Sequence, residues 1–302
     1  MSDEPFLTAL EEGNEEVVRW LLTNSTDMDL NRVFETKRCT PLYTATARGH
    51  AKCVAALLEQ PGLDPNIGCK GFAPLHVAVY GNHDICLEAL LADSRTDPNK
   101  EYDSGCTPLF IAASKGYATC LKALLKNPRI DCNKSSHWGV TPLHAAVRGR
   151  HAQCVETLLA HPDIQPDNVQ LFDDMTALHT AASTIHIFGN EENARIISML
   201  LAHAAVDPNK RSRCGYTPLR KAIKSANMVF HMHARPDHLV ALINLFLTHR
   251  RVDLGGAYED ALFEDTGLFY TNVIPEAVSA EKRRREQWQR RVPWIRSCLC
   301  VP

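Results

Sequence analysis

The sequence has no long hydrophobic run and almost no net charge. No apolar stretch in its 302 residues approaches the ~20 residues that a membrane-spanning helix needs, so we expect no membrane partner. Lys and Arg number 33 against 35 Asp and Glu, and this net charge of -2 gives no reason to expect nucleic acid as a partner. The acidic start, MSDEPFLTALEEGNEE, is unlike a secretory or mitochondrial leader. We therefore expect a protein of the cytoplasm, with the nucleus as the alternative.

The motifs that most enzymes need are also missing. The sequence has no Gly-rich phosphate loop, no G-x-S-x-G segment and no HExxH segment. The densest group of histidines, His231, His233 and His238, has no cysteine nearby to complete a tetrahedral zinc site. We therefore predict a protein without catalytic activity, cofactor or bound metal.

Cysteine is present in an odd number, eleven, which favours free thiols in an intracellular protein. Four cysteines lie 33 or 34 residues apart, and each precedes a Leu-Leu pair by four residues: Cys53, Cys86, Cys120 and Cys154. That regularity indicates an internal repeat. It also predicts that the four thiols are small core residues on one face of a helix.

A second column of the repeat carries the start of a helix. Its members are Pro41, Pro74, Pro108, Pro142 and Pro218, with Ala177 in the one gap. In TPLH at 141–144 the threonine hydroxyl can cap the free amides of a helix while proline fills its first turn. We expect this helix to end at a glycine such as Gly49, Gly116 or Gly149, in the left-handed conformation. A second helix, HAQCVETLLAH in this copy, and a turn such as DPN complete a unit that buries a core only when copies stack.

The unit TPLHAAVRGRHAQCVETLLAHPDIQPD resembles an ankyrin repeat. Seven copies cover roughly residues 1–254 and start near positions 4, 39, 72, 106, 140, 175 and 216. The resemblance implies an all-α solenoid of about seven helix-turn-helix repeats, with the first helices on the concave face and the loops projecting beside it as fingers. It also implies that the protein is a scaffold that binds other proteins, and that His76, His144 and His179 bond local backbone. We expect a monomer.

The variable positions of the repeat, on the fingers and at the ends of the first helices, are the candidate partner-binding residues. They include Lys70, Phe72, Tyr80, Lys115, His137, Trp138, Arg148, Phe172, Arg213 and Tyr216. Lys and Arg outnumber Asp at such positions, which predicts an acidic partner. Trp138 and Phe172 fall on the fingers of successive repeats, and an exposed Trp with Arg nearby is typical of a binding hot spot. The alternative is a merely solvated face on which Trp138 packs against its neighbouring finger.

Two features depart from the repeat. Repeats six and seven have extra residues between their two helices, at roughly 184–193 and 226–237, which predicts an apolar ridge or a neutral loop insertion. Residues 255–302 form an extension with a basic helix at 275–291 that carries Lys282, Arg283, Arg284 and Arg285. This helix could cap the stack or serve as an import signal. The alternative function is an adaptor whose basic helix engages an anionic surface such as nucleic acid, or a ubiquitin-ligase component, although no ligase-adaptor box is evident.

Overall fold

The computed structural model describes residues 4–25, 28–34, 39–184, 191–230 and 236–253, together with Arg283. The chain divides into two units, residues 1–165 and 166–302. Within the described ranges the regular elements are all α-helices, and none of these helices is long and apolar enough to cross a bilayer. The prediction of an all-α fold is confirmed.

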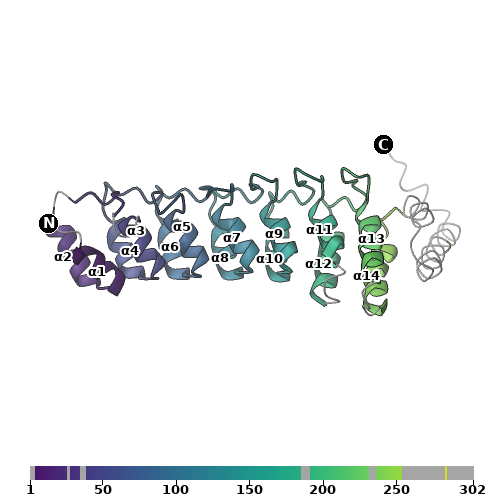
Figure 1. Cartoon of the computed structure of the whole chain (residues 1–302), viewed down its shortest axis with the longest axis horizontal. Coiled ribbons are helices and arrows are strands. Elements are labelled where there is room, and N and C mark those ends of the chain that lie inside the picture. The colour runs from purple at the N-terminus through teal and green to yellow at the C-terminus, as the bar shows by residue number, and fades with distance from the viewer. Residues whose placement is uncertain are drawn as a thin grey trace. The chain divides into compact units, whose positions relative to one another are not determined.

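Unit 1 is a row of five helix pairs (Figure 1). Its helices are α1 (Glu4–Glu12), α2 (Glu15–Asn24), α3 (Pro41–Ala47), α4 (Ala51–Leu58), α5 (Pro74–Tyr80), α6 (Asp84–Ala92), α7 (Pro108–Lys115), α8 (Ala118–Leu125), α9 (Pro142–Gly149) and α10 (Ala152–Leu159). Long loops project along one edge of this row (Figure 1). Each of these loops joins the second helix of one repeat to the first helix of the next, and we call it a finger.

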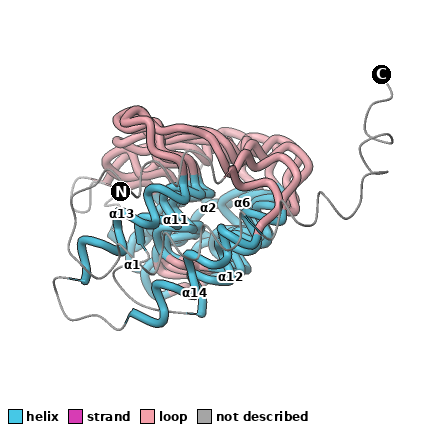
Figure 2. Tube along the Cα trace, turned by 90° about the vertical axis from the view of Figure 1, so that its right-hand side faces the viewer, coloured by secondary structure: helices cyan, strands magenta, loops and turns pink. Residues whose placement is uncertain are grey.

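Unit 2 contains two further helix pairs with longer members. They are α11 (Ala177–Ser183), α12 (Glu191–Ala202), α13 (Pro218–Phe230) and α14 (Pro236–Thr248). Figure 2 shows the loops in pink on one side of the cyan helices. The prediction that residues 226–237 form an insertion between two helices is wrong in part, because α13 continues to Phe230 and α14 already begins at Pro236. The ridge expected from this segment and from 184–193 lies mostly outside the described residues.

The threonine-proline pairs start the helices as predicted. The hydroxyl oxygens of Thr40, Thr107 and Thr141 accept hydrogen bonds from the third backbone N–H beyond them, at 3.2–3.4 Å. Each proline that follows occupies the first helical turn. Repeat three has Ala73 at this position, so α5 lacks the side-chain cap.

This difference predicts opposite effects for two substitutions. Thr141→Ala is expected to lower the free energy of unfolding by about 1 kcal/mol, because it removes the cap of α9. Ala73→Thr is expected to raise it by about 0.5–1 kcal/mol, because it gives α5 the side-chain cap that α3, α7 and α9 have. Urea denaturation of each variant checks both signs. A loss of stability in both would contradict the assignment of capping to this column.

Glycine ends two of the first helices in the left-handed conformation, with φ of 74° at Gly49 and 76° at Gly116. The same prediction for Gly149 is wrong. Gly149 remains in α9, and Arg150 takes the positive φ of 59°. A Cβ at 149 would lie 2.5 Å from the ring of His151, so any larger residue there would require this ring to move.

The cysteine column lies in the core of unit 1, as predicted. Cys53, Cys86, Cys120 and Cys154 are each at most 1% exposed, and all four are free thiols. Burial raises the pKa of Cys86 and Cys154 to about 11 and that of Cys120 to about 12. These thiols stay protonated at neutral pH, which makes them apolar packing groups and poor nucleophiles.

Candidate functional site

The histidines of the first helices are structural. His76, His144 and His179 are at most 1% exposed. In each, Nδ1 accepts a hydrogen bond from the backbone N–H three residues earlier, at 3.2–3.4 Å. Nε2 of His76 and of His179 bonds a carbonyl of the following repeat, at 3.3 and 2.8 Å. Burial lowers the pKa of His76 to about 4 and also lowers that of His179, so both rings are neutral at pH 7.

The fingers are joined by a ladder of asparagine side chains. Its members are Asn31, Asn66, Asn99, Asn133 and Asn209. In each, Oδ1 accepts from a backbone N–H of the next finger at 2.6–2.8 Å, and Nδ2 donates to a carbonyl two residues earlier in that finger at 2.6–2.9 Å. Aspartates such as Asp64 bond their own turn, whereas the asparagines bond across to the next repeat. The ladder fixes the spacing of the fingers.

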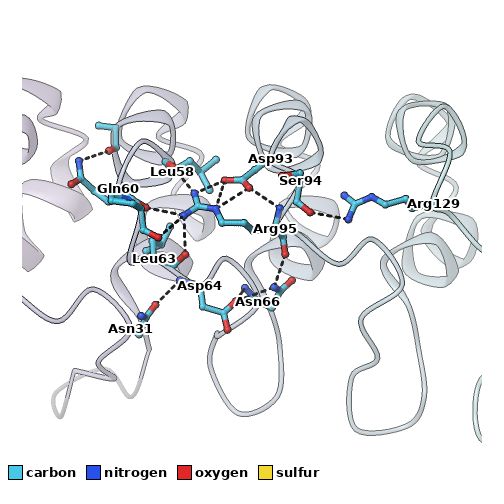
Figure 3. A network of polar contacts seen from close by, with 12 residues as sticks. Asn31, Leu58, Gln60, Leu63, Asp64, Asn66, Asp93, Ser94, Arg95 and Arg129 are labelled. Carbon is cyan, nitrogen blue, oxygen red and sulfur yellow. Dashed lines mark hydrogen bonds and ion pairs between the residues drawn. The ribbon is translucent and has the colours of Figure 1, made fainter.

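Arg95 ties the second helix of repeat two to the turn that ends repeat three (Figure 3). Its guanidinium donates to the carbonyls of Leu58, Gln60 and Leu63 at 2.6, 2.8 and 3.1 Å, and it pairs with the Asp93 carboxylate at 2.6 Å. These carbonyls are at or just beyond the carboxyl end of α4, where a cation also suits the helix dipole. Arg95 therefore holds together the bases of two successive fingers, which carry Phe72 and Tyr102.

Arg251 repeats this arrangement in unit 2, where its guanidinium donates to four carbonyls at or just beyond the carboxyl end of α12, among them Leu201 and Val206 at 2.6 and 2.9 Å. Arg129 occupies the same column and donates to the Ser94 carbonyl at 2.9 Å. Sequence reasoning missed this column. Its signal is an arginine two residues before the turn aspartate or its equivalent, as in Arg95, Arg129 and Arg251.

An aromatic pocket lies on the first helices and fingers of repeats three and four. It has a volume of about 240 Å³ and is lined by Phe72, Tyr80, Tyr102, Cys106, Phe110, Ile111, Ser114 and Lys115. The Phe72 ring packs edge-to-face against Tyr102 at 4.7 Å and against Tyr80 at 6.2 Å between centroids. Such pairs add stabilisation beyond the area they bury and hold the rings in fixed orientations. The pocket is therefore preformed.

One cation stands at the rim of the aromatic pocket. Lys115 Nζ lies 4.8 Å from the centroid of the Tyr80 ring, and both side chains are exposed, Tyr80 at 54%. Lys115 has no ion pair with any residue in the described ranges. The site thus combines an apolar floor with a positive charge that a ligand can reach.

Of the predicted partner-binding residues, Phe72, Tyr80 and Lys115 meet in this pocket. Lys70 is exposed on the same finger as Phe72. His137 lies 3.8 Å from the Glu101 carboxylate, which Lys134 also contacts at 2.9 Å, so this part of the finger row is not purely basic. Arg148 is exposed on α9.

Trp138 and Phe172 are both exposed, at 49% and 71%. Trp138 belongs to unit 1 and Phe172 to unit 2, and each is described within its own unit. Their exposure matches the expectation for finger residues. Their joint action as one hot spot remains a prediction.

Unit 2 has a smaller cluster around Tyr216. Its hydroxyl accepts from Lys224 Nζ at 2.7 Å, and the Arg220 guanidinium lies 4.4 Å from the ring centroid. On the finger, Arg213 donates to the Leu171 carbonyl at 3.0 Å and pairs with Asp174 at 3.4 Å. Arg213 therefore braces two fingers together.

Of the four basic residues predicted in the extension, Arg283 is among the described residues. Arg283 is exposed and helical, whereas Lys282, Arg284 and Arg285 lie outside the described residues. The predicted import or nucleic-acid role of this segment therefore stays a prediction. Among the described residues, no group of three His, Cys, Asp or Glu is placed to hold a metal ion.

Sequence reasoning missed Tyr102 and Phe110 as lining residues. Tyr102 falls on the finger next to Asp103, and Phe110 replaces the buried histidine of the first helix. The Phe110 ring, which takes the place of that histidine, is half exposed and lines the pocket. The departure of Phe110 from the repeat pattern was therefore the available signal.

Two family models match the chain. The model for ankyrin repeats in three copies matches residues 6–102 and 85–170, and the single ankyrin repeat model matches residues 173–213. A search of curated proteins found no match.

Solved structures share the fold at low identity. The ankyrin repeat domain of Bcl-3, a member of the IkappaB protein family, is 22% identical with a TM-score of 0.65, covering 80% of this chain and 99% of that one. The ankyrin repeat protein EF0377 is 22% identical with a TM-score of 0.59, covering 69% and 97%. The human ASB11 ankyrin repeat domain is 23% identical with a TM-score of 0.58, covering 79% and 97%. With the family models matching more than half of the sequence, the chain belongs to the ankyrin repeat family.

Proposed function

We propose that this protein is a non-catalytic scaffold that binds an acidic protein segment, with one large apolar side chain of that segment seated in the aromatic pocket. Ankyrin repeats are a protein-interaction module. The observation that carries the finer proposal is the preformed pocket of Phe72, Tyr80 and Tyr102 with Lys115 at its rim. The centre of the proposed site thereby lies on repeats three and four, with Trp138 and Arg148 extending it along unit 1.

The lining of the pocket favours an apolar anchor. Four rings and the aliphatic side chain of Ile111 line it, together with the hydroxyl of Ser114 and the thiol of Cys106 as small polar groups. Burying a Leu or Phe side chain there would contribute about 1.5–3 kcal/mol. A pocket of about 240 Å³ is large enough for one such side chain.

The charge at the rim favours an acidic neighbour to that anchor. Lys115 already lies over the Tyr80 ring, so a cationic anchor would meet a like charge at the ring face that it prefers. A carboxylate would instead pair with Lys115. Lys70 and Arg148, both exposed, give the same sign to the surrounding surface.

Selection from a library of displayed random dodecapeptides tests the proposal without a known partner. The immobilised full-length protein is expected to enrich peptides with one large apolar residue and Asp or Glu within two positions of it. Their binding should weaken as salt rises from 50 to 300 mM, since rim charges are screened over about 10 Å. Enrichment of Lys- or Arg-rich peptides, or of acidic peptides without an apolar residue, would overturn the pocket as the anchor site.

A further inference from the structure

One position of unit 2 departs from the asparagine ladder. Asp167 stands where the other fingers carry asparagine, and its Oδ2 accepts from the Asp207 N–H at 2.8 Å, as the ladder asparagines do. An ionised carboxylate has no hydrogen to donate, so it cannot make the second bond of the ladder. Its other oxygen, Oδ1, is buried and accepts no hydrogen bond from any residue in the described part of the chain.

We propose that Asp167 makes the joint between the last two fingers of unit 2 sensitive to pH. When protonated, Asp167 carries a hydroxyl that can donate as an asparagine Nδ2 does. By the spacing of the other members, the acceptor is the carbonyl of Ala205, two residues before Asp207. When ionised, it leaves a buried acceptor unpaired, which weakens the joint.

The surroundings of Asp167 act on its titration in both directions. Burial is the largest influence and raises the pKa of Asp167, and the Asp207 carboxylate raises it further. The Asp207 N–H, the Lys210 ammonium and the Arg251 guanidinium lower the pKa, and the net change is upward from the ordinary value. Lys210 itself donates to the Asp167 carbonyl at 2.7 Å, so it holds the backbone of the joint in place in both protonation states.

The sign of the pH effect follows from this shift. A carboxyl whose pKa is higher in the folded than in the unfolded protein stabilises the fold most below its unfolded pKa, near 3.9. That stabilisation is lost as the pH rises through the folded pKa. The joint is therefore expected to loosen as the pH rises above the unfolded pKa of Asp167, opposite in direction to the salt-bridged carboxylates of unit 1, such as Asp93, whose pKa Arg95 lowers.

Hydrogen exchange on the full-length protein tests the proposal, with Asp167→Asn as the variant. At pH 7 the Asp207 amide is expected to exchange about tenfold more slowly in Asp167→Asn than in the parent, because the missing bond is restored. At pH 4 the two proteins should exchange alike at matched conditions.

The matched control is Asn133→Asp, which places the same carboxylate in the ladder of unit 1. In the parent the Gln165 N–H donates to Asn133 Oδ1 at 2.8 Å. In the variant this N–H should exchange about tenfold faster at pH 7, and its exchange rate should return toward that of the parent as the pH falls to 4. A ratio between Asp167→Asn and the parent that is the same at both pH values would overturn the proposal. So would an Asn133→Asp variant whose exchange does not depend on pH.

Discussion

Replacing Arg95 with alanine is expected to lower the free energy of unfolding by about 2–3 kcal/mol. Each hydrogen bond that the charged guanidinium donates stabilises the fold, and the substitution takes this donor away from several carbonyls. The Arg95 side chain is only 33% exposed and bonds the carbonyls of Leu58, Gln60 and Leu63 as well as the Asp93 carboxylate (Figure 3). The carboxyl end of α4 should therefore fray.

Urea denaturation and hydrogen exchange of the α4 amides measure this effect. Arg129→Ala is the matched control, since Arg129 occupies the same column but bonds the single carbonyl of Ser94. Its loss is expected to cost below about 1 kcal/mol. An equal loss of unfolding free energy in the two variants would show that the number of carbonyls bonded does not determine how much an arginine of this column stabilises the fold.

Replacing Phe72 with alanine is expected to weaken the binding of a selected acidic peptide by about 30-fold, which is the roughly 2 kcal/mol of an interface hot spot. Phe72 contacts both Tyr80 and Tyr102, so its removal takes away a wall of the pocket and the order of the other two rings. Fluorescence anisotropy with a labelled peptide measures the change.

Phe72 is half exposed, and its loss should leave the fold intact, which circular dichroism of the same sample checks. Ile85→Ala is the control, because Ile85 is a 71% exposed apolar residue on α6 outside the pocket lining. Its affinity should equal that of the parent. Equal weakening by the two substitutions would point to general stickiness of exposed apolar groups instead of a defined pocket.

The fold was predictable because residues at fixed positions of the repeat mark where its helices begin and which of their faces are buried. Threonine and proline in a fixed column begin the first helix at Pro108 and at Pro142, and a cysteine four residues before Leu-Leu marks the buried face of the second. These features are local and recur in several copies, so a spacing of 33 or 34 residues is enough to place them. The pattern of helix starts fails at Ala73, because alanine at the threonine position has no hydroxyl to cap α5.

The contacts between repeats were less predictable. Asparagine in a turn is expected to bond its own backbone, yet Asn66 and Asn99 bond the next finger, because stacking brings another backbone within reach. Likewise Arg95 reads as a surface cation, although its guanidinium caps a helix 37 residues earlier in the chain. Such contacts depend on the distance between neighbouring copies, which the sequence of one copy does not specify.

The candidate site was half predictable for the same reason. Variable positions such as Tyr80 and Lys115 follow from the register of the repeat alone. Their meeting with Tyr102 and Phe110 in one pocket depends on two repeats at once. The prediction that gave most weight to Trp138 and Phe172 relied on exposure and residue type, which identify a finger residue but do not locate a concavity.

Filling the pocket is the most direct test of the claim that it anchors the partner. Ser114 is exposed and lines the pocket, so Ser114→Trp places an indole in the volume that the anchor would occupy, while Ile85→Trp adds the same indole elsewhere. Titration calorimetry with the tightest selected acidic peptide should then show no measurable binding for Ser114→Trp and unchanged affinity for Ile85→Trp. Parent-like binding by a folded Ser114→Trp protein would contradict the claim.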